Sequence, residues 1–192
     1  MALLAAFAVV VVKLSAQEQF RIGILVANRN QPEMKDLIGL FMNTLLLRFR
    51  VHPDSSYRDV LRHTREVFLE TFEHQDVPFE LLLQELEQRG VDRSGLCQVV
   101  FVMQPPWIGT LQIPGLRVSA ADNEAAGRLQ IYPTAFELIV NVAEAEGKML
   151  ATITFKPDLF RRETIQRVAE EWLNVLRTAT QDVNMTMAVR TN

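Results

Sequence analysis

The stretch Leu37-Ile38-Gly39-Leu40-Phe41-Met42-Asn43-Thr44-Leu45-Leu46-Leu47-Arg48 sets a single amide, Asn43, in a run that is otherwise almost wholly apolar. A buried amide needs partners for both its donor and its acceptor atoms, because leaving them unpaired costs roughly 1–3 kcal/mol. Asn43 is therefore either internal scaffolding that bonds the backbone or a group held ready for a ligand. The sequence alone leaves both interpretations open.

The run continues into a pattern that is typical of a half-exposed strand. Leu47, Phe49 and Val51 alternate with Arg48 and Arg50, so one face is apolar and the other is charged. An earlier β-type run covers residues 20–26, and a loop rich in turn-forming residues covers 27–32. We therefore expect two strands joined by a long loop in this part of the chain.

Three later segments have the start signals or the spacing of helices. Ser56 with Asp59 resembles a capping box and begins a helix that we expect to end near residues 74–77, just before Pro78. Pro78 suits the first position of a second helix, which runs to Leu86. A last helix is expected over residues 162–180. Its predicted inward side consists of Ile165, Val168, Ala169, Trp172, Leu173 and Leu176.

Residues 1–12 form an apolar segment that is too short to cross a bilayer, which needs about 20 residues. The segment also lacks the basic region that opens a signal sequence. It is best interpreted as a helix that is apolar on all sides and packed inside the protein. We expect its covering layer to come from residues before Met1 in a longer protein.

Together these elements predict an α/β fold, a two-layer sandwich of a mixed, largely antiparallel sheet with helices. The other strands are expected at 97–104, 135–145 and 148–155, the last two joined by a tight turn at Glu146-Gly147. Residues 1–192 are expected to form a single unit. The connection over 105–128 is long and rich in proline and glycine, and such a connection usually has a function.

Composition and charge exclude several classes of function. The formal net charge is -3, which gives no electrostatic reason to bind nucleic acid or an anionic membrane. The single cysteine, Cys97, lies beside an apolar run, so it is interpreted as a small buried hydrophobe. A chain with no internal disulfide suits a reducing cytoplasm.

The sequence offers no catalytic constellation. It has no glycine-rich phosphate loop, no Cys-x-x-Cys, no His-Glu-x-x-His and no Gly-x-Ser-x-Gly, so nucleotide, zinc and serine-hydrolase sites are not predicted. The three histidines, His52, His63 and His74, lie apart and suit surface or capping roles. No base or nucleophile for a stand-alone enzyme is apparent, and no metal site is predicted.

Several motifs resemble those of condensation domains from nonribosomal peptide synthetases, a family of the chloramphenicol acetyltransferase-like superfamily. Residues 38–45, followed by Arg48, are similar to the family's Ile-Gly-x-Phe-Val-Asn-Thr-x motif, and residues 74–80 match His-Gln-Asp-x-Pro-Phe-Glu. Leu96-Cys97-Gln98-Val99 is a weaker match. Phe136-Glu137-Leu138 is similar to the family's Phe-Asp-Leu with a longer acid, and Asp158-Leu159-Phe160 resembles its Asp-Leu-Phe. The resemblance runs in order along nearly the whole chain.

The resemblance implies half of a condensation domain. Such domains have two similar lobes, and the catalytic His-His-x-x-x-Asp-Gly motif of the first lobe is absent from this sequence. The chain therefore resembles the C-terminal lobe, which supplies one wall of the tunnel and is not expected to turn over alone. In the family, amide bonds form between amino acids or peptides tethered to carrier proteins by phosphopantetheine arms. The implied partners are the N-terminal lobe, peptidyl carrier proteins and an adjacent adenylation domain, and an isolated fragment could form a homo-oligomer.

Residue roles follow from the same resemblance. Asn43, Arg29 and Gln98 are expected to line the tunnel or orient the substrate, although Asn28 replaces a glycine of the family's Ala-Gly-Arg loop. Residues 105–128 correspond to a latch that reaches across to the first lobe. The remaining motif residues are expected to be structural, with His74 and Phe79 fixing the corner between two helices. The structural set is Gly39, Arg48, His74, Pro78 and Phe79.

Two alternatives remain open. One is a non-catalytic module that docks carrier proteins or self-associates through its apolar first helix. The other is a trimeric acetyltransferase that uses coenzyme A, which the missing catalytic histidine disfavours.

Overall fold

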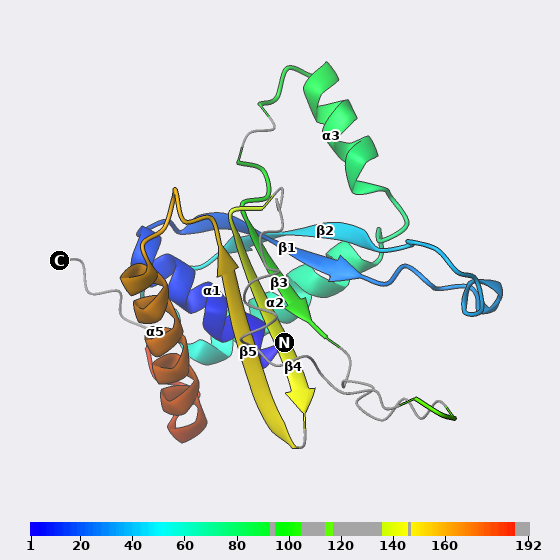
Figure 1. The fold of residues 1–192 in the computed structure, drawn as a ribbon. Coiled ribbons are helices and arrows are strands. Elements are labelled where there is room, and N and C mark those ends of the chain that lie inside the picture. Colours follow the sequence, from blue (N-terminus) through cyan, green and yellow to red (C-terminus); the bar gives the residue numbers. More distant parts are fainter. Residues whose placement is uncertain (93–94, 105–113, 117–135, 146, 187–192) are drawn as a thin grey trace.

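The computed structural model describes residues 1–92, 95–104, 114–116, 136–145 and 147–186. The elements in chain order are α1 (Ala2–Ser15), β1 (Gln19–Val26), the short 3-10 helix η1 (Pro32–Met34), β2 (Asn43–Arg50), α2 (Tyr57–Phe72), α3 (Phe79–Gln88), β3 (Val99–Met103), β4 (Leu138–Ala145), β5 (Lys148–Phe155) and α5 (Arg162–Gln181) (Figure 1).

The strands form one five-stranded sheet in the order β2-β1-β3-β4-β5. The two outer pairs, β1 with β2 and β4 with β5, are antiparallel, whereas β3 runs parallel to both of its neighbours. The predicted mixed sheet is confirmed, with its pairings evenly divided between the two kinds. The alternation predicted for β2 is also confirmed, because Leu45, Leu47 and Phe49 are buried while Arg48 and Arg50 are exposed.

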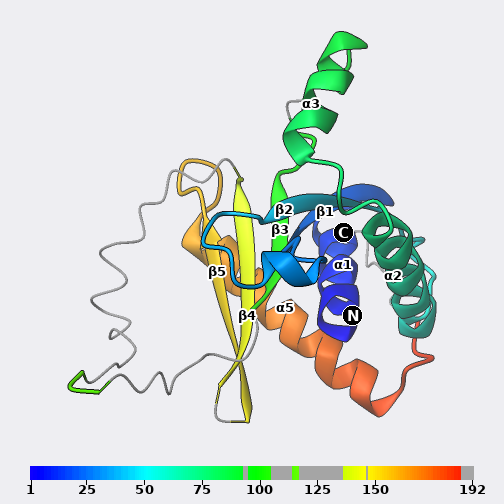
Figure 2. The same cartoon turned by 90° about the vertical axis from the view of Figure 1, so that its right-hand side faces the viewer.

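Helices α1, α2 and α5 lie on the same face of the sheet (Figure 2). The apolar α1 lies at the centre of the core, where the Phe7 ring packs against those of Phe101 and Trp172, with centroids 5.9 and 5.8 Å apart. Two side chains of the covering helices also fasten the first turn of α1. Tyr57 Oη donates to Ala2 O at 2.8 Å, and Trp172 Nε1 donates to Leu3 O at 3.0 Å.

These contacts correct one expectation about α1. Its covering layer was expected to come from residues before Met1, but α2, α5 and the sheet of this chain bury the core residues of α1. Self-association through the apolar face of this helix is therefore not supported either. Lys13 adds a polar tie, since its Nζ lies 2.6 Å from Glu171 Oε1 on α5.

The last helix has the predicted position, and its inward face differs from the predicted one at Leu173 and Val175. Ile165, Val168 and Trp172 are buried as expected, whereas Leu173 is 49% exposed. Val175 is buried in its place. The helical period explains the correction, because Val175 lies three and seven residues after Trp172 and Val168 and so shares their side of the helix.

The capping box that opens α2 is confirmed. Ser56 Oγ accepts from Asp59 N at 3.2 Å, and Ser56 N donates to Asp59 Oδ2 at 3.3 Å. The Ser56 hydroxyl also donates to Asp59 Oδ2 at 2.5 Å, and this bond, with the one from Ser56 N, lowers the pKa of the Asp59 carboxyl below its ordinary value. The helix then buries Tyr57, Val60 and Thr64 against the core.

In contrast, α3 lies apart from the core and projects beyond the β2 edge of the sheet (Figure 1). None of its residues is buried. The predicted long connection over 105–128 lies outside the described residues apart from 114–116. In the part of the chain that the structure describes, no helix has the length and apolarity needed to span a membrane.

Candidate functional site

The side chain of Asn43 holds the corner between α2 and α3. Its Nδ2 donates to Gln75 O at 2.8 Å and to Val77 O at 2.7 Å. Its Oδ1 accepts from Phe79 N at 3.0 Å and from Thr44 N at 2.9 Å. A neutral amide has two donor hydrogens and two acceptor lone pairs, so every one of them is used within the chain.

This geometry favours the scaffolding interpretation of Asn43 over the ligand-binding one. The side chain is only 7% exposed and has no spare hydrogen-bonding capacity with which to orient a substrate. Its bonds instead attach the base of α3 to the start of β2. A second tie at the same corner joins Asn30 Nδ2 to Asp76 Oδ1 at 3.1 Å.

Arg29 organises the long loop between β1 and β2. Its Nη1 donates to the carbonyl oxygens of Met34 and Leu37, and its Nη2 donates to Gly39 O at 3.1 Å. The guanidinium carbon also lies 4.4 Å from the centroid of the Phe41 ring. The planar fork of donors therefore folds the loop around itself, which is a structural role in this chain.

The backbone at Asn28 explains how this loop tolerates the loss of the family's glycine. Asn28 has a φ of 50°, in the left-handed region. Asparagine enters this region more readily than most other residues, so the replacement preserves the turn that leads into Arg29.

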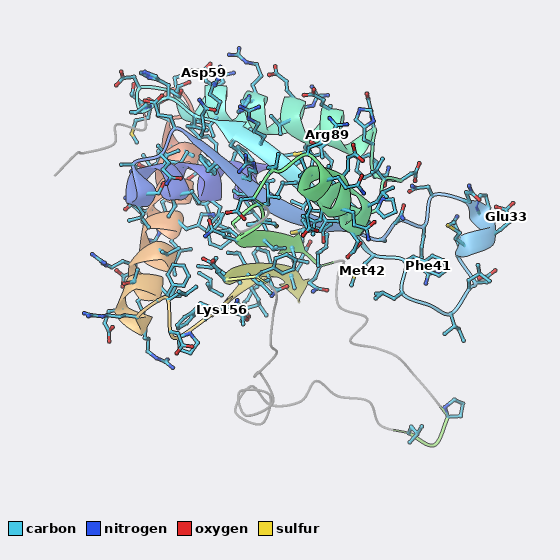
Figure 3. All side chains as sticks on the ribbon, turned by 90° about the horizontal axis from the view of Figure 1, so that it is seen from above. Glu33, Phe41, Met42, Asp59, Arg89 and Lys156 are labelled. Carbon is cyan, nitrogen blue, oxygen red and sulfur yellow. The ribbon has the colours of Figure 1, made fainter. Side chains whose placement is uncertain are left out.

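The loop carries an exposed apolar surface, and the sequence did not predict this exposure. Residues 37–42, called the apolar loop below, leave the side chain of Ile38 fully exposed and that of Leu40 83% exposed, with Leu37 and Met42 about half exposed. Figure 3 shows Phe41 and Met42 along this loop, between the body of the chain and Glu33 in η1. A cluster of large apolar side chains in water is typical of an interaction site.

The exposed apolar surface continues at the base of α3. Val77, Leu81 and Leu82 are exposed there, although the helix is amphipathic. Asn43 joins this corner directly to the end of the apolar loop, so the two surfaces are neighbours. An amphipathic helix with no buried residue lacks a partner for its apolar side within the described chain.

Gln98, the third predicted tunnel residue, lies away from this corner, immediately before β3 and beside the start of β4. Its Nε2 donates to Glu137 Oε1 at 3.1 Å, and its carbonyl oxygen accepts from Glu137 N at 2.8 Å and Leu138 N at 3.1 Å. The side chain is exposed. The structure thus places Gln98 apart from Asn43 and Arg29, which belong to adjoining parts of one corner.

The motif residues with predicted structural roles have unequal contacts. Phe79 N bonds Asn43, and the carbonyl of Pro78 accepts from the N–H groups of Leu81 and Leu82 at 3.1 and 3.2 Å, which opens α3. His74 is exposed, and its N–H extends the end of α2 by bonding Thr71 O. Gly39 contributes its carbonyl to Arg29.

The side chain of Arg48 projects from the face of the sheet opposite the helices. Its Nη2 donates to Gln19 Oε1 at 3.3 Å, and Arg21 is its cross-strand neighbour on β1. Its exposure is consistent with the charged face that the alternating pattern predicts.

His63 has a capping role that its position in the sequence did not specify. Its Nε2 accepts from Arg50 N at 3.0 Å, and its ring meets that of Phe49 edge-on, 6.1 Å between centroids. The imidazole therefore covers an outward-facing amide at the end of β2. His52 accepts from Asp54 N at 3.3 Å in the following turn, so the histidines do not converge.

Cys97 is only half-buried, so the prediction of a small, fully buried hydrophobe is met in part. Burial raises the pKa of its thiol from 9.0 to about 11, against a smaller opposing effect of a backbone hydrogen bond from Gly23. A thiol this weakly acidic is a poor nucleophile at neutral pH. Among the described residues, no group of three histidine, cysteine or acidic side chains could hold a metal ion.

Comparisons with known proteins place the chain in a family. The profile of the family described as "Condensation domain" matches residues 1–189. One of the linear gramicidin synthase proteins of Brevibacillus parabrevis is 37% identical over 92% of this chain, and cyclosporin synthetase simA of Tolypocladium inflatum is 35% identical over 91%. The matched stretches are only 3% and 1% of those two proteins.

Solved structures show the same fold. The X-domain from teicoplanin biosynthesis superposes with a TM-score of 0.79 at 18% identity, covering 100% of this chain and 43% of that one. The condensation domain from the monacolin K polyketide synthase MokA gives a TM-score of 0.76 at 20% identity and covers 97% and 42%. The chain therefore spans less than half of these domains. On the evidence of the family profile and the related synthetases, it belongs to the condensation-domain family of nonribosomal peptide synthetases.

Proposed function

We propose that this chain is the C-terminal lobe of a condensation domain and forms one wall of a chamber in which carrier-tethered thioesters are joined by an amide bond. The facing wall, the N-terminal lobe, carries the His-His-x-x-x-Asp-Gly motif that the 192 residues lack. The chain alone is then inactive. Phosphopantetheine arms of peptidyl carrier proteins bring the substrates, an adenylation domain is the neighbour in the synthetase, and the setting is the cytoplasm.

The observation that carries this proposal is the exposed apolar surface of the apolar loop and the base of α3. Ile38 and Leu40 have almost no contact with the rest of the described chain, and α3 buries no residue. Exposing these side chains to water is unfavourable by roughly 1.5–3 kcal/mol for each one that could otherwise be fully buried. A second lobe of the same domain would supply the missing apolar partner.

Asn43 and Arg29 have positioning roles in this proposal. Asn43 fixes the angle at which α3 leaves the body, and Arg29 gives the apolar loop its shape. Neither side chain touches substrate in this arrangement. Gln98 has an exposed side chain and remains the candidate for lining the tunnel, and residues 105–128 remain the candidate latch.

Reconstitution tests the proposal. The chain is mixed with a separately expressed N-terminal lobe that bears the histidine motif, and amide formation between two carrier-bound aminoacyl thioesters is followed by mass spectrometry of the intact carriers. We expect product only when both lobes are present. Product from the chain alone, or none with both lobes despite measured binding, would overturn the proposal.

Matched variants locate the docking surface. Ile38→Glu should weaken binding of the N-terminal lobe by at least about tenfold in calorimetry, because a charge replaces an apolar anchor. Leu173→Glu, an equally simple change at an exposed leucine on α5, should leave it unchanged. Equal affinities of both variants would exclude the apolar loop as the docking surface.

A second candidate is a non-catalytic module that docks carrier proteins. The absence of the catalytic motif from this sequence favours it as much as it favours the half-domain. The two differ in the reconstitution, because a docking module binds a carrier protein without restoring amide formation when the N-terminal lobe is added.

A further inference from the structure

The two edges of the sheet are protected unequally. On β2, the outward-facing N–H of Thr44 donates to Asn43 Oδ1 and that of Arg50 donates to His63 Nε2. Arg48, between them, places a charge on the same edge strand. Side-chain caps and charges of this kind prevent an edge strand from pairing with another strand.

The hydrogen-bonding direction of β5 follows from its neighbours. Leu138 N donates to Gln98 O and Val142 O accepts from Gln104 N, so the even-numbered residues of β4 bond β3 and the odd-numbered ones face β5. The register pairs Asn141 with Thr152 and Ala143 with Leu150. The backbone N–H and C=O groups of the even-numbered residues of β5 therefore bond β4, while those of Met149, Ala151 and Ile153 point away from the sheet at its edge.

These outward-facing groups are available. Within the described part of the chain, no residue gives the backbone N–H or C=O of Met149, Ala151 or Ile153 a hydrogen-bond partner across the edge. The stretch 149–155 contains no charged side chain, and Met149 and Leu150 are about half exposed. An uncharged, apolar and exposed edge is the kind that accepts another strand.

We propose that β5 pairs antiparallel with β5 of a second copy of this chain, joining the two sheets into one. With the two-fold axis at Ala151, Met149 lies opposite Ile153 of the second copy and Lys148 lies opposite Thr154. Three facing pairs then exchange about six backbone hydrogen bonds. This register places no two like charges opposite each other, and it pairs apolar side chains on the face that the helices cover.

This inference is independent of the proposed function, because it concerns the 192-residue chain alone. The oligomeric state is measured by sedimentation from micromolar to near-millimolar concentration, where a dimer is expected. Amide exchange followed by NMR adds residue detail. The amides of Met149, Ala151 and Ile153 should become protected as the concentration rises, whereas those of Leu150 and Thr152 should be protected throughout.

Matched proline variants test which edge is used. Ala151→Pro removes an outward-facing N–H from β5 without taking a bond from β4, so the dimer dissociation constant should rise at least about tenfold. Leu46→Pro makes the same change on the β2 edge and should leave that constant unchanged. Circular dichroism and the exchange pattern of the core confirm that both variants are folded.

A monomer at every concentration would overturn the inference. So would a dimer that survives Ala151→Pro in a folded chain, or one that Leu46→Pro disrupts equally. Concentration-independent protection of the Ala151 amide would mean that the chain itself covers this edge, and would also overturn it.

Discussion

Gly23 and Cys97 are in direct contact on the face of the sheet opposite the helices: a Cβ atom added to Gly23 would lie 2.6 Å from Cys97 Sγ. The same atom would lie 3.1 Å from Val100 Cγ2. Glycine is thus required at position 23 in β1 because the Cys97 side chain leaves no room for a Cβ atom. Its conformational freedom is not the reason, because its φ is not in the left-handed region.

This contact predicts the effect of enlarging Gly23. Gly23→Ala should lower the free energy of unfolding by about 1–3 kcal/mol, the usual cost of overpacking a core. Cys97→Ala removes the sulfur that the new methyl group would meet. The double variant should therefore lose less unfolding free energy than the sum of the losses in the two single variants. Urea denaturation of the four proteins measures the coupling. Additive effects would show that the backbone moves instead.

Replacing Asn43 should detach the corner between α2 and α3. Asn43→Ala leaves the Phe79 and Thr44 amides and the Gln75 and Val77 carbonyls without their partner, and we expect a loss of about 2–4 kcal/mol of unfolding free energy. Proteolysis near residues 75–79 should accelerate in the same variant, because those bonds hold the corner.

Asn43→Asp provides a sharper test of the same hydrogen bonds. The change is isosteric, but it turns a carboxylate oxygen toward the carbonyls of Gln75 and Val77, which repel it. The variant should be destabilised at pH 7 and partly recover as the pH falls and the carboxyl gains a proton. An Asn43→Asp protein as stable as the wild type at pH 7 would contradict the assigned orientation of the amide.

The fold was largely predictable because it depends on local patterns. The alternation of β2, the capping box of α2 and the apolar character of α1 each determine an element through short-range chemistry. On α5, Val175 is buried where Leu173 was predicted to be. This is a small shift of the buried face around the helix, and it depends on where α1 lies. Only the packed structure determines that position.

The site was less predictable because its residues act through distant backbone groups. Asn43 was singled out from the sequence, but three of its four partners lie 32 to 36 residues away, and no sequence pattern identifies a carbonyl as an acceptor. Hydrophobicity alone also suggested one continuous apolar run from Leu37. The structure divides that run into an exposed loop and a buried strand. The loop is held away from the core by the hydrogen bonds that Arg29 donates to the carbonyl oxygens of Leu37 and Gly39.

The half-buried thiol of Cys97 predicts how stability depends on pH. Its pKa is raised in the folded chain from an ordinary 9.0 to about 11. A group whose pKa is raised on folding contributes stability that is complete below the unfolded pKa and is lost as pH rises through the folded one. Stability should therefore decline between about pH 9 and 11, and Cys97→Ala should remove this part of the decline. Alkylation of Cys97 at pH 8 should be far slower in the native chain than in urea, and equal rates would refute its burial.

Arg29 allows a test that separates shape from charge. Arg29→Lys keeps the positive charge but loses the planar fork that reaches the carbonyls of Met34, Leu37 and Gly39 together. We expect both Arg29→Lys and Arg29→Ala to speed amide exchange in the apolar loop, with a change of less than about 1 kcal/mol in global stability because the loop is outside the core. If charge alone mattered, the lysine variant would match the wild type. If the loop shapes the docking surface, both variants should also weaken binding of an N-terminal lobe, although neither removes an apolar side chain from that surface.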